Sequence, residues 1–159
     1  MRYAHWTRNK LLARVGGVRR IKTMSQKGHI TGMAGEFFVM EKLFRMEHEA
    51  SITLGNAKAI DILTRSPQGN LYEVSVKAIR GGGKWGIGNH DYSKYPNMVF
   101  VLLHYKRFSE IDYFPDVWII PAVEAEKVKL PWHQGFGLYI YKKHAHLLEP
   151  YKNAWHHLA

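Results

Sequence analysis

Two short segments of the chain carry acidic, hydroxyl and amino side chains at the spacing of β-strands. Residues 59–64 and 71–76 are rich in Ile, Leu, Val, Thr and Tyr, and the turn formers Ser-Pro-Gln-Gly-Asn lie between them. This pattern predicts an antiparallel β-hairpin. Because side chains alternate along a strand, one face of the hairpin is apolar and the other is polar. The polar face is predicted to carry Asp61, Glu73, Ser75 and Lys77.

The register of this hairpin follows from its turn. A symmetric turn pairs Arg65 with Leu71, Leu63 with Glu73, and Asp61 with Ser75, with opposed Cβ atoms about 5 Å apart. One interpretation is an exposed face on which Asp61 and Lys77 form a cross-strand ion pair of little energetic value. The other is a reactive site, which is favoured because Lys77 ends an apolar strand just before three glycines.

A helix is predicted ahead of the hairpin, over residues 31–46, where apolar residues recur at helical spacing. Thr31 or Gly32 would cap it, which places Glu36 in the first turn. A carboxylate there interacts favourably with the helix dipole. A second interpretation is that the small residues before Glu36, Gly35 among them, let this carboxylate approach another element closely.

The remaining elements complete a mixed-sheet α/β fold. Continuous apolar runs predict buried strands at residues 98–103 and 116–121. Four further elements are predicted: a short strand at 51–54, a short helix at 122–129, a strand at 136–141 and a closing helix at 150–158.

Residues 81–88 form a glycine-rich, cationic stretch after the hairpin. The spacing of a phosphate-binding P-loop is absent. The stretch is predicted to be either a mobile substrate-contacting loop, in which Lys84 supplies charge and Trp85 a stacking surface, or a plain linker.

Composition limits the classes of protein that remain. The 159 residues suffice for one domain with a hydrophobic core, and 46% of them are apolar. The absence of cysteine excludes disulfides, zinc–thiolate sites and cysteine catalysis. No apolar run approaches the roughly 20 residues that span a bilayer. We therefore expect a soluble, cytoplasmic protein.

The net charge of +10 comes from the N-terminal segment. Eight Lys and Arg residues precede the first acid, Glu36, and the rest of the chain is nearly neutral. We therefore divide the chain into a basic extension, residues 1–30, and a single domain, residues 31–159. The extension is open to three interpretations: an arm that binds phosphates, a dispensable extension ahead of a start at Met24 or Met33, or an organelle-targeting peptide.

Other site classes have weaker support. Histidines cluster at His144 and His146 and at His156 and His157, but neither pair has an obvious third metal ligand. A Ser-His-Asp hydrolase lacks its G-x-S-x-G turn. Most tyrosines and tryptophans are expected to pack in the core or at its edge.

The order and spacing of the helix and the hairpin resemble the PD-(D/E)xK nuclease superfamily, which includes restriction endonucleases and Holliday-junction resolvases. The similarity covers residues 31–158 and rests on three motifs. These are Gly35-Glu36-Phe37, Ala59-Ile60-Asp61-Ile62-Leu63 and Val74-Ser75-Val76-Lys77. It implies a restriction-endonuclease-like mixed central sheet flanked by helices.

The resemblance also implies a function and a set of site residues. The function would be metal-dependent hydrolysis of phosphodiester bonds, most simply in DNA, with Mg²⁺ or Mn²⁺ as cofactor. Independently of the resemblance, a homodimer is possible because dimers are the commonest closed assembly. Asp61, Glu36 and Glu73 would serve the metal, and Lys77 would orient the attacking water. Nucleic-acid contacts are assigned to Lys84, Trp85, Arg80, Arg19 and Arg20.

Ser75 departs from the family pattern, which has Glu, Asp or Gln at this position. A serine hydroxyl can bind a metal but adds no negative charge, and Glu73 could compensate through a metal-bound water. The alternative is a catalytically inactive protein of the same fold that binds nucleic acid.

Overall fold

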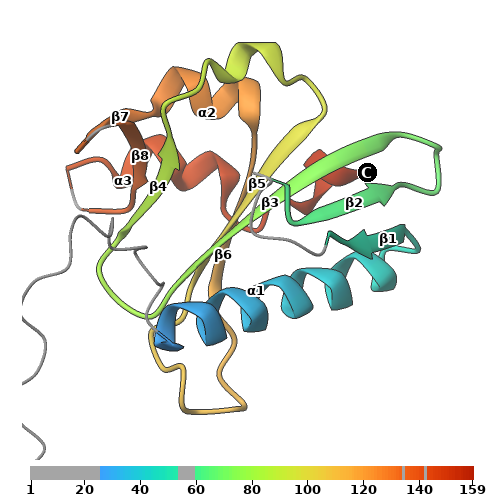
Figure 1. The fold of residues 1–159 in the computed structure, drawn as a ribbon, viewed down its shortest axis with the longest axis horizontal. Helices are drawn as coiled ribbons and strands as arrows, with labels where there is room; N and C mark the ends of the chain where they lie inside the picture. Colours follow the sequence, from blue (N-terminus) through green and yellow to red (C-terminus); the bar gives the residue numbers. More distant parts are fainter. Residues whose placement is uncertain (1–25, 54–59, 134, 142) are drawn as a thin grey trace, which may run out of the picture.

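A computed structural model describes residues 26–53, 60–133, 135–141 and 143–159. Its centre is a five-stranded sheet with strand order β1-β2-β3-β5-β6 (Figure 1). The strands are β1 (Glu49–Ile52), β2 (Ile62–Arg65), β3 (Leu71–Ile79), β5 (Met98–His104) and β6 (Asp116–Pro121). β3 and β5 are parallel, and the other neighbours are antiparallel. The fold class is therefore the predicted mixed-sheet α/β.

The hairpin register is confirmed. Ile62 pairs with Val74, Leu63 with Glu73 and Arg65 with Leu71. β2 begins one residue after Asp61, whereas β3 continues to Ile79. The two strands therefore separate at Asp61.

β5 is buried along its whole length and separates two hydrophobic cores. Its odd-numbered residues face a core that includes Val39 and Leu43 of α1 (Gln26–Arg45). Its even-numbered residues face a second core that includes Trp85 and Leu138. The continuous apolar run thus folds as predicted for a strand covered on both faces.

The helix before the hairpin starts earlier than predicted. α1 begins at Gln26, so Thr31 and Gly32 lie inside the helix. The Thr31 hydroxyl donates to the Lys27 carbonyl at 2.7 Å instead of capping the helix. Glu36 is ten residues from Gln26, and the interpretation of Glu36 as a first-turn partner of the helix dipole is wrong.

A second sheet covers the face of the central sheet opposite α1. It has the order β4-β8-β7 and consists of β4 (Lys84–Gly88), β7 (Leu130–Trp132) and β8 (Gly135–Tyr139). The glycine-rich stretch that was predicted as a loop or linker therefore supplies a strand from Lys84 to Gly88. It does so because Trp85 and Ile87 alternate with small residues and are buried in the second core.

The chain ends in short helical turns instead of the predicted helix over residues 150–158. α2 (Ala122–Val128) is followed after β8 by α3 (Ala145–Leu148), and then by 3₁₀ turns at Glu149–Tyr151 and Trp155–Leu158. Asn153, with φ of 52°, interrupts the helix, and its amide donates to the Val117 carbonyl at 3.0 Å.

Within the described residues, no helix combines the length and apolar character that a membrane span requires.

Candidate active site

Asp61 lies where β2 and β3 separate. Its backbone amide donates to the Val74 carbonyl at 2.9 Å. Its carboxylate Oδ2 accepts from the Val76 amide at 2.7 Å and lies 3.5 Å from Ser75 Oγ. The Asp61 side chain thus accepts the hydrogen bond that a backbone carbonyl of β2 would otherwise accept from Val76. It does so at the point where the pairing between β2 and β3 ends. This hydrogen bond fixes the carboxylate against the edge of β3.

Glu36 and Lys77 belong to the same electrostatic group as Asp61. Burial is the main reason that the pKa of Glu36 is raised, and the charge of Asp61 raises it further. The charge of Lys77 lowers the pKa of both Glu36 and Asp61. A side chain from α1 and two from the hairpin are therefore brought together around one place in the fold.

Gly35 explains how α1 comes close enough to β3 for Glu36 to join this group. A Cβ atom at Gly35 would lie 2.8 Å from the Cβ of Ala78 and 3.0 Å from Cδ1 of Leu103. Since these distances are shorter than ordinary van der Waals contact, the helix can occupy this position only without a side chain there. α1 therefore packs closely on β3 at Gly35, the residue directly before Glu36.

The surroundings of Asp61 and Glu36 make ionisation of their carboxyl groups less favourable than in water. Burial is the largest influence on the pKa of Asp61 and raises it, outweighing Lys77 and the hydrogen bonds from Val76 and Ser75. The pKa of Glu36 is also raised. Ionisation of either carboxyl group therefore carries a cost that Lys77 offsets only in part, which is the condition in which a bound cation is favourable.

We expect the substitution Asp61→Asn to stabilise the metal-free protein by about 1 kcal/mol at pH 7, since it removes the charge and keeps an oxygen acceptor for Val76. A raised pKa means that the folded state binds a proton more readily than the unfolded state. The destabilising effect is therefore present above the pKa of folded Asp61 and disappears as pH falls through it. Thermal unfolding with a chelator at pH 7 and at pH 4 measures this difference. An equal or lower melting temperature for the variant at pH 7 would contradict it.

The oxygen atoms at this place are suited to a hard divalent cation. Asp61 and Glu36 supply carboxylates, and the Val76 carbonyl projects from the same edge of β3 as the Val76 amide that donates to Asp61. Among the described residues, no group of three or more His, Cys, Asp and Glu side chains is placed to hold a metal. Mg²⁺ fits a site of this kind because it is commonly bound by one or two carboxylates and keeps several waters.

The other hairpin residues of the predicted site are placed less favourably. The Ser75 side chain is fully buried, and its hydroxyl lies against Asp61. Glu73 pairs with Leu63, two residues further toward the turn, and lines a groove of about 720 Å³. Glu36, Asp61 and Lys77 do not line that groove.

The predicted nucleic-acid contacts have different outcomes. Trp85 is only 2% exposed, and its Nε1 donates to the Leu103 carbonyl at 3.3 Å, so the proposal that it stacks on bases is wrong. Arg80 is held by Thr31, at 2.5 Å, and by the ring of Phe108, 3.5 Å away. Lys84 is exposed. Arg19 and Arg20 lie outside the described residues.

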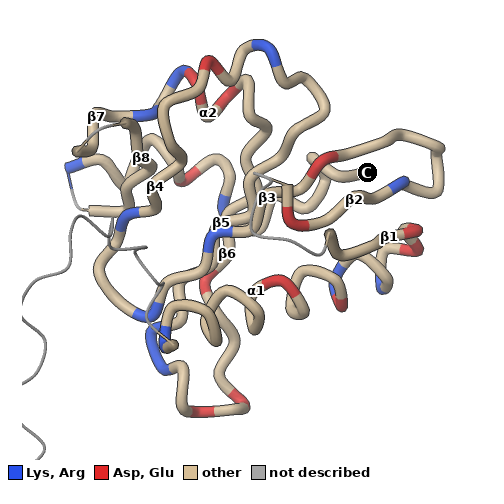
Figure 2. Tube along the Cα trace, viewed as in Figure 1, with Lys and Arg blue, Asp and Glu red and all other residues tan. Residues whose placement is uncertain are grey.

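Lysines and arginines gather where the N-terminal end of α1 approaches the turn between β3 and β4 (Figure 2). Lys27 and Arg80 line one hollow there. A residue that the sequence did not single out lies beside Lys84: the Trp132 ring is 5.4 Å from Lys84 Nζ and covers Gly86. Gly86 lies on β4, which is separated from β7 by β8. This glycine is the sequence signal for the ring, because a Cβ at Gly86 would overlap the Trp132 side chain.

Comparisons with known proteins support the fold. Neither family models nor curated proteins gave a match. Among solved structures, the chain is similar to that of a bacterial homing endonuclease, I-Ssp6803I, with a TM-score of 0.52 and 15% identity. The similarity covers 85% of this chain and 93% of the other. The five-stranded mixed sheet flanked by helices is thus an endonuclease-like fold.

Proposed function

We propose that this protein is a metal-dependent nuclease of the PD-(D/E)xK type that hydrolyses phosphodiester bonds of DNA. The observation that carries the proposal is the grouping of Glu36, Asp61 and Lys77, from α1 and from both strands of a hairpin, in which each carboxyl pKa responds to Lys77. The order of these residues is the one that the superfamily uses. The similarity to a homing endonuclease in fold is consistent with it.

Each residue has a role that follows from its chemistry. Asp61, fixed by the Val76 amide, would hold the metal together with the Val76 carbonyl. Glu36 would hold a second metal or a metal-bound water from the helix side. Lys77 would orient the attacking water and offset the negative charge of the phosphate. The metal, when bound, would polarise the phosphate and lower the pKa of water.

The buried Ser75 changes this site relative to the superfamily pattern. It leaves two charged ligands where three are usual, so we expect weaker metal affinity and activity only at millimolar Mg²⁺. Glu73 is too far along the strand to take its place directly, since two residues of a strand span about 6.6 Å.

A nucleic acid, most simply DNA, is proposed as the substrate because Lys27 and Arg80 line one hollow near the N-terminal end of α1. Lys84 and the eight Lys and Arg residues that precede Glu36 in the sequence, Lys27 among them, also favour a polyanion. This electrostatic attraction does not depend on the base sequence of the nucleic acid. It therefore contributes to affinity and to the rate of association, and not to sequence specificity.

The proposal is tested with the purified full-length chain and supercoiled plasmid DNA. We expect nicked or linear product with Mg²⁺ or Mn²⁺, none after chelation, and recovery when the metal is restored. A parallel assay with RNA checks the substrate class. Salt-sensitive DNA binding without cleavage at any metal concentration would instead identify an inactive protein of this fold that binds nucleic acid.

A further inference from the structure

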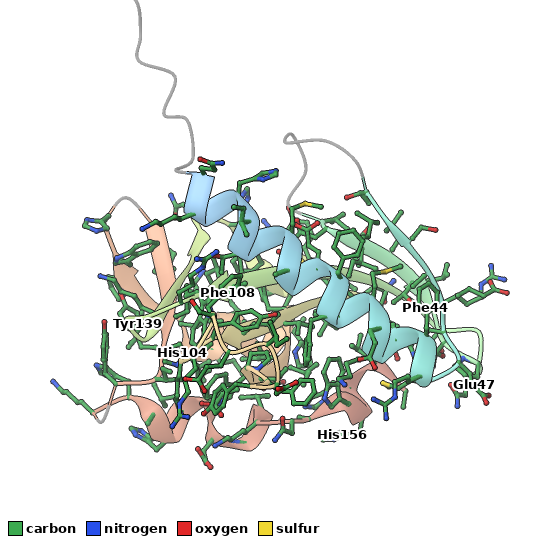
Figure 3. The ribbon with its side chains drawn as sticks, turned by 90° about the horizontal axis from the view of Figure 1, so that it is seen from below. Phe44, Glu47, His104, Phe108, Tyr139 and His156 are labelled. Carbon is green, nitrogen blue, oxygen red and sulfur yellow. The ribbon has the colours of Figure 1, made fainter. Side chains whose placement is uncertain are left out.

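α1 presents an apolar stripe on the side that faces away from the sheet. The residues that it buries against the sheet are Thr31, Gly35, Val39 and Leu43. On the opposite side lie Ile30, Phe37 and Phe44, which are 46%, 60% and 55% exposed. In Figure 3 α1 lies in front of the rest of the molecule, with Phe44 at its C-terminal end.

The spacing of the stripe identifies the shape of its partner. Ile30, Phe37 and Phe44 are seven residues apart, which is close to two helical turns, so they form one line along the helix. Burial of each such side chain contributes about 1.5–3 kcal/mol. An apolar line with this repeat is typical of a surface that packs against another helix.

We propose that this stripe is the interface of a homodimer, in which α1 packs antiparallel against α1 of a second copy. Phe37 lies midway between Ile30 and Phe44. A two-fold axis at Phe37 therefore places each Ile30 against Phe44 of the partner subunit and Phe37 against its own counterpart. The stripe is its own complement under this rotation, as an isologous interface requires.

Two charged residues that flank the stripe agree with the antiparallel direction. Lys27 lies in the first turn of α1, and Glu47 lies in the turn two residues after Arg45, the last residue of the helix. Both are exposed, and each is ten residues from Phe37. The same two-fold axis brings Lys27 near Glu47 of the partner subunit, whereas parallel helices would bring like charges together. Glu41, the acidic residue within the helix beside the stripe, already binds Lys42 and Arg45 of its own chain.

The length of the helix limits the strength of this dimer. α1 has 20 residues, so it is about 30 Å long. A single helix pair of this length buries less than the roughly 800 Å² per partner of a standard interface, so the association is weak and depends on concentration. Formation of this dimer does not depend on nuclease activity.

Sedimentation velocity over a hundredfold concentration range tests the proposal. We expect the wild-type sedimentation coefficient to rise with concentration, and Phe37→Glu to raise the dissociation constant about tenfold or more. Because Phe37 is exposed, the variant should keep its circular-dichroism spectrum and melting temperature at low concentration. Tyr95→Glu is the control, since Tyr95 is also exposed, at 41%, but follows the 3₁₀ turn Tyr92–Lys94, which packs against α2. A wild-type monomer throughout, or a Phe37→Glu dimer as tight as wild type, overturns the proposal.

Two further variants test the direction of the helices. Lys27→Glu and Glu47→Lys should each weaken the dimer, and the double variant should restore it. Because the chain has no cysteine, Phe37→Cys places one thiol at the axis, and a short bismaleimide should link two copies of it. Tyr95→Cys under the same conditions should stay monomeric. The antiparallel arrangement is overturned if the double variant does not dimerise, or if Tyr95→Cys is linked and Phe37→Cys is not.

Discussion

Asp61→Asn and Lys77→Ala are each expected to lower the rate of metal-dependent DNA cleavage by about 10²–10⁴-fold, the range that a positioned acid–base or charge-stabilising group supplies. Asp61→Asn keeps an acceptor for the Val76 amide, so the loss would come from the missing charge and not from local unfolding. Lys77 is half-buried and pairs with Leu102 of β5, so its removal changes the site without altering the strand order. Single-turnover cleavage rates at saturating metal measure both effects.

The control for these variants is Asp112→Asn, which removes a carboxylate that is exposed in the loop between β5 and β6. Its cleavage rate should equal that of the wild-type protein. Cleavage that persists undiminished in both the Asp61 and Lys77 variants would show that the nuclease chemistry lies elsewhere. Binding of DNA by the two variants should change little, because the cations near the N-terminal end of α1 remain.

Gly35→Ala is expected to destabilise the fold by about 1–3 kcal/mol, the usual cost of inserting a methyl group into a packed core. The added Cβ would lie 2.8 Å from the Cβ of Ala78, and relief requires movement of α1 away from β3. Glu36 follows Gly35 directly, so the same movement should lower cleavage beyond the effect on stability. Urea unfolding and cleavage rates at a temperature where the variant is folded separate the two effects.

A second-site change tests the physical reason. Ala78→Gly removes the methyl group that Gly35→Ala would strike, and the double variant should recover most of the lost stability and cleavage. Gly32→Ala is the matched control on the same helix, because a Cβ at Gly32 has no neighbour within 4 Å. A loss in Gly32→Ala as large as that in Gly35→Ala would refute the packing explanation.

The sequence was sufficient to predict the hairpin and its neighbour strands. A short turn between two alternating segments leaves little freedom of register, so the Leu63–Glu73 pair was predictable. The continuous apolar run at residues 98–103 predicts a strand that is buried on both faces, because neither face has polar side chains to present to water. The small residue Gly35 indicated that the helix packs closely against another element, and α1 does pack closely on β3 there.

The incorrect predictions arose where long-range packing decided the local structure. Thr31 has the composition of a cap, yet the helix extends past it because Gly35 and Val39 dock against the sheet. Trp85 follows three glycines and resembled a loop residue, but its ring fills the second core. Asn153 ends the helical turns through a hydrogen bond to Val117, a residue 36 positions earlier. None of these contacts has a local signal in the sequence.

The separation of β2 and β3 at Asp61 divides the site between parts of the fold with different local stability. Lys77 lies on a strand that is hydrogen-bonded to β5, the most deeply buried strand of the sheet. Asp61 lies at the start of a four-residue strand that connects only the edge strand β1 to the rest of the sheet. Because short edge elements open more often than buried strands, transient opening of the β1–β2 edge would remove the carboxylate and leave the ammonium in place. A cation that binds to Asp61 would therefore also close this edge, so that metal occupancy and local order rise together.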